Sequence, residues 1–473
     1  MMSSVTNTRP LSRIWPFLLL FAVGFLCMYR PVWDMDFGWH LASGRWILEQ
    51  GHVPRTDPFS FLTGGRDWID HEWAAHVGMA WVEGFAGIEG LKVLAALIVG
   101  SSCVLFAMGF ARRGFTSIGV VGAVFLLLYL FESRLRIRPH LLTLLGASLL
   151  YALPIGKLSL GKALGLILFY LVWLNCHGGW ILAPIHALAL AIMASLSDDD
   201  PDPYLSWVGI FAILSLFNPY FYRLPLSTLR ISEVATLIPE WKPIFVLGPE
   251  HNLRALLSVA LALLSLAAIA VSWQRRHGDG ETLAPAVYGQ PMGLSSQRFL
   301  FLQALALPLI ARLAWTRRIP TTLWALLALL PLGLEQGQRW LKLSESEGGP
   351  ARAWVQGKFP EEAVAWIQKQ NLRGNLLCPP AWAGYCVLQL GERVKIAVDG
   401  RLELFDPDLA ERIRLLYVPG SRIHYTLEQK PDLLVQPRIQ QQGRLEGIPL
   451  PIGLKGSYHK VFESPRAEVW QRN

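Results

Sequence analysis

The first candidate for chemistry is a charged stretch that directly follows a long apolar run near the N-terminus. Residues 33–60 read WDMDFGWHLASGRWILEQGHVPRTDPFS and contain Asp34 and Asp36 in an Asp-x-Asp pattern. A carboxylate just outside a membrane helix is partly desolvated, so it can take the proton from an attacking hydroxyl group or hold a metal ion. The pair predicts a general base, or ligands for magnesium or manganese; a solvated loop is the alternative for either aspartate alone.

More polar side chains follow in the same loop, residues 31–88, and could line a cavity or contact an acceptor: His40, Arg45, Asp57, His71 and Glu72. His71, Glu72 and His76 invite comparison with the zinc-protease helix motif. That motif places its histidines four positions apart, whereas these are five apart and turn to different helix faces. We therefore expect His71 and Glu72 to anchor the loop or line its cavity. The spacing of Leu41, Trp46 and Ile47 predicts a helix lying along the membrane surface.

A second signal is the arginine-rich stretch ESRLRIRPHL at residues 132–141. Arg134, Arg136 and Arg138 run into Pro139, which suits the first turn of a helix. Guanidinium groups beside the positive end of a helix dipole form an anion site suited to phosphate or pyrophosphate. Arginines that extend to lipid headgroups are the alternative.

A third signal is WLNCHGGW at residues 173–180, which places Asn175 and His177 at the end of an apolar helix. Its two glycines allow close backbone approach, and a structural histidine is the alternative to a site role. The longer stretch 218–243 could cover the same surface, with these candidates for acceptor contact: Glu233, Glu240 and Trp241.

The elements that must position these residues are membrane helices. Of 473 residues, 52% are hydrophobic and 16% are charged, which is too apolar for an ordinary soluble enzyme. Apolar runs that approach the roughly 30 Å of a bilayer core are 14–30, 89–110, 115–132, 139–154, 162–175, 179–196, 204–217, 252–273, 297–314 and 320–336. We predict a transmembrane domain over residues 1–342 and a soluble domain over 343–473.

Short loops rich in Lys and Arg mark the inner side of the membrane, which puts loop 31–88, the arginine stretch and the loop after residue 218 outside. The basic residues at 275–276 and at 317–318 are then both expected on the inner side. The chain must therefore cross the membrane an even number of times between them. Residues 281–297 would supply one, as a weakly apolar crossing or a re-entrant segment. A full crossing gives eleven passes, an external C-terminal domain and Arg298 within reach of phosphate; ten passes and an internal C-terminus are the alternative.

The net charge of +8 is spread over loops, so nucleic acid is not an expected partner. The sequence has no Walker loop, nucleophile elbow or dinucleotide fingerprint in a suitable context. Its five cysteines form no metal pattern, and only Cys378 and Cys386 could pair, in an oxidising compartment.

The soluble tail alternates short apolar stretches with turns. We expect helices at 359–370 and 406–418, the second capped by Asp406. Strands are expected at 374–380, 394–401, 431–436, 458–464 and 467–472, which makes a small α/β domain. Asp399 and Arg401 in VDGR could bind an acceptor, although charges at a strand end are more often structural.

Three strings, DMDFGWHLASGRWILEQGHVPRTDPFSF followed by GRDWIDHEW, RIRPHLLTLL and WLNCHGGW, resemble in order and spacing those of bacterial GT-C glycosyltransferases, the superfamily of protein O-mannosyltransferase-like and aminoarabinose transferase-like enzymes. GYCVLQLGERVKIAVDGRLELF at 384–405 resembles their soluble tail. The resemblance covers residues 10–340 loosely and is strongest in 30–180. The weakly apolar 281–297 departs from it, because relatives have a clear helix there.

The resemblance implies a polytopic α-helical protein of the bacterial cytoplasmic membrane that takes a sugar from a polyprenyl-phosphate donor. Transfer to a glycan, lipid or protein acceptor would occur at the external face, with inversion. Asp36, favoured over Asp34, would be the general base or a metal ligand. The three arginines would hold the departing lipid phosphate. The alternatives are a non-catalytic subunit of the same fold and a transporter; the inverted repeats typical of transporters are not evident in the sequence.

Overall fold

The computed structural model describes residues 11–63, 65–230, 239–246, 252–274, 280–315, 333, 335–339, 341, 353–355, 357–417, 430–441, 444–447 and 456–473. The chain forms two compact units. The helical unit comprises Met1–Arg30, Lys92–Asn218 and Pro239–Ala351. The mixed unit comprises Pro31–Leu91, Pro219–Ile238 and Arg352–Asn473. The long first loop thus groups with the tail, a grouping that the sequence analysis did not predict.

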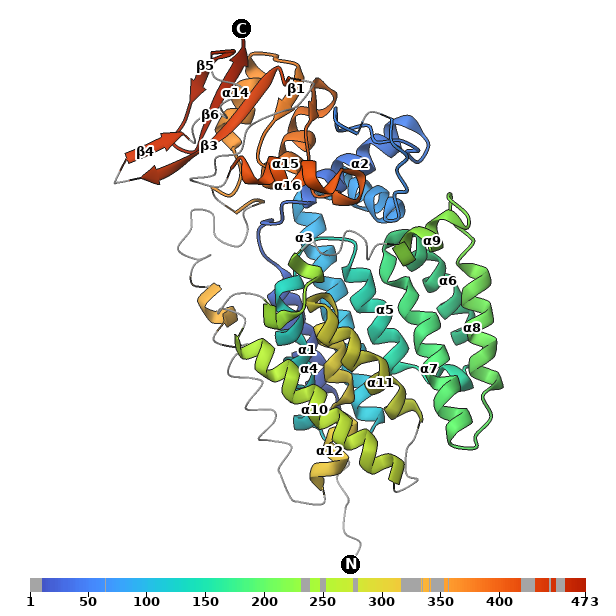
Figure 1. Cartoon of the computed structure of the whole chain (residues 1–473). Helices are drawn as coiled ribbons and strands as arrows, with labels where there is room; N and C mark the ends of the chain where they lie inside the picture. The colour runs from blue at the N-terminus through green and yellow to red at the C-terminus, as the bar shows by residue number, and fades with distance from the viewer. Residues whose placement is uncertain are drawn as a thin grey trace, which may run out of the picture. The chain divides into compact units, whose positions relative to one another are not determined.

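The helical unit is a bundle of apolar helices that pack side by side (Figure 1). Its elements are α1 (Leu11–Met28), the second part of α3 (Trp73–Arg112), α4 (Ser117–Phe131), η1 (Glu132–Arg134), α5 (Leu141–Ala152), η2 (Ile155–Lys157), α6 (Leu160–Cys176), η3 (Gly178–Ile181), α7 (Leu182–Leu196), α8 (Asp202–Leu214), η6 (Pro239–Trp241), η7 (Ile244–Val246), α10 (Asn252–Gln274), α11 (Gly280–Ser295), η9 (Gln297–Ala306) and α12 (Leu307–Trp315).

Four helical stretches among the described residues are long and apolar enough to cross a membrane: Trp73–Arg112, Ser117–Arg134, Gly178–Leu196 and Asn252–Gln274. Shorter apolar helices are Ile14–Met28, Leu141–Ala152, Leu160–Cys176 and Asp202–Leu214. Helices occupy nine of the ten predicted apolar runs. Most of the tenth, 320–336, lies outside the described residues. The number of passes stays a prediction.

Residues 281–297, the weakly apolar segment, form helix α11 in spite of Pro285 and Pro291 inside it. At its start, Glu281 pairs with Arg112 at 2.9 Å. Just beyond its end, the Ser296 hydroxyl donates to the Glu240 carbonyl at 3.0 Å. The helix therefore runs between the two ends of the bundle that the charge pattern assigns to opposite sides of the membrane. A full crossing by this segment stays a prediction, since a helix alone does not fix its place in a bilayer.

Helix α3 is two helices joined at Gly87, whose φ of 64° and ψ of −167° interrupt the helical backbone. This region of backbone space is open essentially to glycine alone. Residues 73–86 belong to the mixed unit, and the unit boundary follows a few residues beyond the kink, at Leu91. The predicted apolar run 89–110 corresponds to the second helix.

The tail is an α/β domain, as predicted, built on a six-stranded sheet of order β2-β1-β3-β6-β5, with β4 beside β3. Strand β1 is parallel to β2 and β3, whereas β6 is antiparallel to β3 and β5. The elements are α14 (Glu361–Lys369), β1 (Gly374–Leu377), α15 (Pro380–Leu390), η11 (Gly391–Arg393), β2 (Val394–Ile396), η12 (Leu402–Leu404), α16 (Pro407–Leu415), β3 (Leu433–Gln441), β4 (Arg444–Gly447), β5 (Tyr458–Glu463) and β6 (Ala467–Arg472).

Both predicted tail helices and the five predicted strands are present. The Asp406 side chain accepts from the Leu409 amide at 3.0 Å and caps α16 as expected. Helix α15 and strand β4 were not predicted. Cys378 and Cys386 are buried free thiols in the structure.

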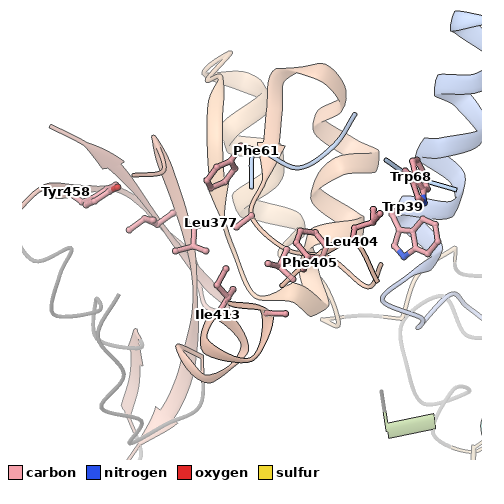
Figure 2. Packing of buried hydrophobic residues seen from close by; sticks show 12 residues of the cluster. Trp39, Phe61, Trp68, Leu377, Leu404, Phe405, Ile413 and Tyr458 are labelled. Carbon is pink, nitrogen blue, oxygen red and sulfur yellow. The ribbon is translucent and has the colours of Figure 1, made fainter. Parts of the chain in front are cut away.

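The first loop contributes to the hydrophobic core of the tail (Figure 2). Its Trp39, Phe61 and Trp68 lie in one buried cluster with Leu377 of β1 and Leu434 of β3. The loop backbone also pairs with edge strand β2, because the Phe61 amide donates to the Ile396 carbonyl at 3.0 Å and the Ile396 amide donates to Phe59 at 2.9 Å. Pairing of this kind satisfies a sheet edge that would otherwise be open.

Helix α2 (Phe37–Gln50), predicted from its spacing, packs against α15 within the mixed unit. A Cβ on Gly38 would lie 2.2 Å from the Gly384 carbonyl oxygen, so the two helix backbones are in direct contact. The first half of α2 is buried on all its faces. This close packing, which depends on a glycine in each helix, differs from the helix resting on a membrane surface that we expected. The mixed unit also holds α9 (Arg223–Arg230).

Candidate functional site

The predicted anion site is an arginine cluster in the helical unit, in which four guanidinium groups converge on the carboxylate of Glu240. Arg136 lies 2.7 Å from Oε1 of Glu240, and Arg138 lies 3.8 Å from the same oxygen. Arg134 contacts Oε2, and Arg298 lies 3.4 Å from it. Both carboxylate oxygens are therefore bound by two arginines each, which is the geometry that guanidinium groups offer to phosphate oxygens as well.

The four arginines control the ionisation of Glu240. Burial by itself would raise the pKa of Glu240, but the surrounding arginines hold that pKa well below its ordinary value. Glu240 is therefore ionised throughout the physiological pH range. This one carboxylate is shared by four guanidinium groups.

The local fold explains how the arginines converge. A 3₁₀ turn, η1, follows α4, and the alternate positions 134, 136 and 138 lie in the turn-rich connection to α5. His140, at the N-cap of α5, contacts the Arg134 carbonyl through Nε2 at 2.6 Å, which holds the connection in place. Arg298 lies at the start of η9, three residues beyond the end of α11, and stacks on Trp241, with its guanidinium carbon 4.4 Å from the ring centroid.

The prediction that these arginines lie together is thus met, and Arg298 joins them. Glu240 and Trp241 were predicted to contact an acceptor; the structure gives Glu240 the different place of counter-ion to the arginines. Glu233 lies outside the described residues.

A buried ionic cluster beside η1 was not predicted. Glu132 is fully buried and lies 2.9 Å from Arg254 of α10 and 3.8 Å from Arg30. Arg339 also contacts this carboxylate. Glu132 stands in the same motif as the arginines, but a sequence pattern cannot tell which of the neighbouring charges is turned into the bundle.

The Asp-x-Asp pair lies at the start of α2 in the mixed unit, and its two members differ. Asp34 is buried, and its Oδ1 accepts from the Asp36 amide at 2.7 Å. Asp36 is partly exposed at the N-cap position of α2 and makes no side-chain cap hydrogen bond. Its Oδ1 lies 1.9 Å from where a Cβ on Gly400 would be, so the VDGR segment passes directly beside this carboxylate. Asp34 thus holds the backbone in front of α2, whereas the side chain of Asp36 is partly exposed.

The mixed unit brings together His40, Glu72 and His76, whose ligand atoms all lie within 4.8 Å of one another. No second group of three or more His, Cys, Asp or Glu side chains with such geometry is found among the residues that the structure describes. The rejection of a His71–His76 metal pair from their spacing is consistent with this arrangement, because the partner of His76 is His40. That pairing was invisible in the sequence, where 36 positions separate the two histidines.

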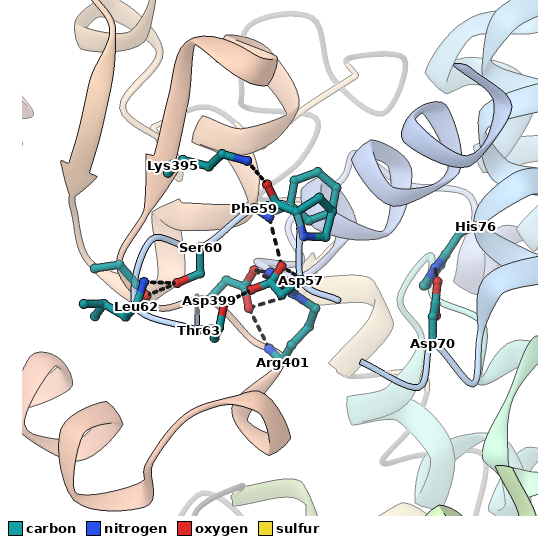
Figure 3. Close-up of polar contacts among 12 residues, drawn as sticks. Asp57, Phe59, Ser60, Leu62, Thr63, Asp70, His76, Lys395, Asp399 and Arg401 are labelled. Atoms are coloured by element: carbon teal, nitrogen blue, oxygen red, sulfur yellow. Dashed lines mark hydrogen bonds and ion pairs between the residues drawn. The ribbon is translucent and has the colours of Figure 1, made fainter. Parts of the chain in front are cut away.

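Asp57 and the VDGR motif form a buried ionic triad (Figure 3). Arg401 lies 2.7 Å from Asp57 and 2.7 Å from Asp399, and its side chain is fully buried. Asp399 and Asp57 raise the pKa of Arg401 despite its burial. Asp57 also accepts from the Thr63 hydroxyl at 2.7 Å. These contacts favour the structural reading of VDGR over acceptor binding.

The remaining predicted residues have structural contacts. Arg45 pairs with Glu83 at 2.8 Å, and His71 lies 3.8 Å from Glu72. Asn175 donates to the carbonyls of Leu171 and Phe217.

His177 lies 2.6 Å from the Thr143 hydroxyl and accepts from the Gly179 amide at 3.0 Å. It therefore caps η3, as a satisfied structural histidine would.

Solved structures with a similar fold are oligosaccharyltransferases. The apo form of the enzyme from Archaeoglobus fulgidus matches with a TM-score of 0.51 and 12% identity, over 90% of this chain and 70% of the archaeal chain. Oligosaccharyltransferase AglB from Archaeoglobus fulgidus, in complex with an inhibitory peptide and a dolichol-phosphate, matches with a TM-score of 0.54 at the same identity and coverage. No family model and no curated protein matches the sequence.

The chain thus has a fold similar to that of these oligosaccharyltransferases. At 12% identity the likeness concerns the fold. This fold agrees with the fold that the sequence resemblance implies, and membership of the superfamily stays a prediction. A bacterial origin and the protein O-mannosyltransferase-like group stay predictions.

Proposed function

We propose that the protein is a membrane glycosyltransferase that transfers a sugar from a polyprenyl-phosphate donor to an acceptor hydroxyl group at the external face of the membrane. The observation that carries the proposal is the convergence of four arginines on one anion in a GT-C fold. The neighbours with this fold are named oligosaccharyltransferases, and one of them was solved with a dolichol-phosphate.

In the proposed reaction, the arginine cluster binds the phosphate of the donor. The bond between the anomeric carbon and the phosphate oxygen breaks, and the polyprenyl phosphate leaves with increased negative charge. Fixed cations aimed at that charge stabilise the transition state more than the ground state. The donor phosphate would take guanidinium contacts of the kind that Glu240 makes in this structure.

Asp36 is proposed as the general base. It accepts the proton of the acceptor hydroxyl as the oxygen attacks the anomeric carbon, and attack opposite to the leaving group inverts that centre. The base role is preferred to a magnesium or manganese site shared with Asp34, because Oδ1 of Asp34 already accepts the Asp36 amide. Full activity without added magnesium or manganese would agree with this preference.

The test measures release of undecaprenyl phosphate from undecaprenyl-phosphate hexoses by the purified protein in nanodiscs. This readout reports transfer or hydrolysis whatever the acceptor is. Asp36→Asn and Arg138→Ala are each expected to lower release by about 10²-fold or more, as loss of a base or of a charge-stabilising donor does. Arg112→Ala, which removes an arginine paired with Glu281 at the other end of α11, is the matched control.

Wild-type rates in both variants would overturn the assignment of the site. Binding of undecaprenyl phosphate, measured on the same nanodiscs by native mass spectrometry, separates the two roles. Arg138→Ala should weaken binding of this product, whereas Asp36→Asn should leave binding intact and remove turnover. A protein that binds the lipid phosphate but turns over no donor would instead support a non-catalytic subunit.

A further inference from the structure

The mixed unit contains a buried cluster of two imidazoles and a carboxylate that the proposed sugar transfer does not use. His40 comes from α2, His76 from the first turn of α3, and Glu72 from the turn just before α3. His40 Nδ1 lies 2.9 Å from His76 Nε2, and Glu72 Oε2 lies 3.5 Å from the first nitrogen and 3.8 Å from the second. All three residues are buried.

These separations fit one small cation. Zinc binds imidazole nitrogen and carboxylate oxygen at about 2.0 to 2.2 Å, so two ligands of a tetrahedral site lie about 3.3 Å apart. The three observed separations lie on both sides of that value. A point near the centre of the triangle is thus within bonding reach of all three atoms after shifts of a few tenths of an ångström.

Asp70 supplies the contact that a metal-binding histidine usually has on its far side. Its Oδ2 lies 2.9 Å from Nδ1 of His76 (Figure 3). A proton on Nδ1, donated to this carboxylate, leaves the lone pair of the neutral ring on Nε2, the atom that faces His40. Carboxylate–histidine pairs of this kind fix the tautomer and orientation of the ligand. Asp70 is itself held, because its Oδ1 accepts from the Glu72 amide at 3.2 Å.

The helices that carry the ligands are held close together. A Cβ on Gly44, one turn after His40, would lie 1.9 Å from the carbonyl oxygen of His76, so α2 and α3 are in backbone contact there. The Trp39 ring lies beside His40, with the two rings tilted by 37° and their centroids 3.8 Å apart, and it meets His76 edge-on at 5.3 Å. The three side chains are therefore held close together by packing before any ion binds.

We propose that His40, Glu72 and His76 bind one zinc ion, with Asp70 orienting His76. Two imidazoles and one carboxylate favour zinc over magnesium, which prefers an all-oxygen shell. Three protein ligands leave a fourth position for water. The ion fastens α2 to the start of α3 inside the loop that carries Asp36, and it takes no part in the transfer step.

The test uses the full-length protein in detergent, freed of metal with a chelator and then titrated with Zn²⁺ in competition with a chromophoric chelator. One equivalent is expected to bind. The apo protein should also show a rise in thermal midpoint on adding Zn²⁺, and none with Mg²⁺, because an ion that binds only the folded state stabilises it. Co²⁺ in place of zinc should give the visible absorption of a tetrahedral site.

Variants separate the site from adventitious binding. Glu72→Gln and His76→Asn should abolish binding of the one equivalent of Zn²⁺. Asp70→Asn should lower the affinity for Zn²⁺ about 10- to 100-fold. His52→Ala is the matched control, since His52 is exposed just beyond α2 and contacts the Val53 carbonyl. Failure of the wild type to bind one equivalent, or binding that survives loss of these ligands, would overturn the proposal. If a ligand variant does not fold, the wild-type protein alone still tests the proposal, because the absence of a rise in its thermal midpoint on adding Zn²⁺ would overturn it.

Discussion

The guanidinium of Arg401 lies 2.7 Å from the carboxylate of Asp57, although 344 positions separate the two residues. Both side chains are fully buried, and Arg401 stacks among Trp68, Phe59 and Trp39. One motif of the first loop and one motif of the tail are therefore two halves of a single buried ionic site. The charge of Asp57 thus serves to fold the first loop onto the tail.

We predict that Arg401→Met strongly destabilises the mixed unit, because it leaves the carboxylates of Asp57 and Asp399 buried without their cation. Breaking a buried pair by removing one partner costs about 3 to 5 kcal/mol. The measurement is the thermal midpoint of the purified protein, followed by tryptophan fluorescence. Arg414→Met is the control, since the Arg414–Glu411 pair is exposed and exposed pairs contribute about 0 to 1 kcal/mol. Equal midpoints for the two variants would contradict the prediction.

The contact of α2 with α15 gives a second prediction. In Gly38→Ala the new methyl group would overlap the Gly384 carbonyl, so the helices must separate. Overpacking of this kind costs about 1 to 3 kcal/mol. Gly78→Ala, on the first part of α3, meets no atom within 4 Å and should be neutral or slightly stabilising. The comparison requires only the two thermal midpoints, and a lower midpoint for Gly78→Ala than for Gly38→Ala would rule out the close-packing explanation.

The structural features that depend on the local sequence pattern could be predicted from the sequence. The tail strands and the cap at Asp406 follow from alternation and capping preferences, and the arginines of ESRLRIRPHL lie together because they are close in the chain. Arg298, expected near these arginines from the charge of the loops around it, lies 3.4 Å from Glu240 beside them, while its place on the external side stays a prediction.

Contacts between distant segments could not be predicted in the same way. Nothing in the local pattern pairs His40 with His76 or Asp57 with Arg401, because each pairing depends on how whole elements pack. Helix α15 was missed because PAWAGYCVLQL begins with proline, contains a glycine and is apolar on most faces, so it lacks the amphipathic period of a surface helix. Glu240 was assigned to an acceptor because its position opposite the arginines is a tertiary feature.

A third prediction concerns Glu240 as the anion among the arginines. Glu240→Gln keeps the shape of the side chain and removes its negative charge. The variant should be less stable than the wild type in the absence of ligand, because four guanidinium groups lose their shared carboxylate. It should bind undecaprenyl phosphate more tightly, by at least about tenfold, because a repulsive charge beside the lipid phosphate is gone. Native mass spectrometry and thermal midpoints with and without the lipid measure both effects.

Glu240→Gln is thus expected to lower the stability of the protein and to raise its affinity for undecaprenyl phosphate. These opposite changes distinguish an anion site from a purely structural carboxylate. A purely structural Glu240 would lower the midpoint and the affinity together, which would argue against an anion site at the arginines. Lys242→Gln is a matched change, since it removes a charge one residue beyond Trp241 without touching the four contacts to Glu240. It should leave both readings near those of the wild type.

The last prediction separates the two aspartates of the Asp-x-Asp pair. Asp34→Asn weakens the hydrogen bond that Asp34 accepts from the Asp36 amide, so it should lower the thermal midpoint as well as the rate. Asp36→Asn keeps the shape of the side chain and should leave the midpoint within about 1 °C while removing turnover, since its role is to accept a proton. Gly400→Ala provides an independent check, because its methyl group would overlap Oδ1 of Asp36 and must displace that carboxylate. Displacing a base by about 1 Å lowers rates by about 100-fold, so Gly400→Ala should lower kcat strongly while binding of undecaprenyl phosphate is unchanged. A Gly400→Ala protein that folds normally and turns over at the wild-type rate would show that Asp36 is not the base.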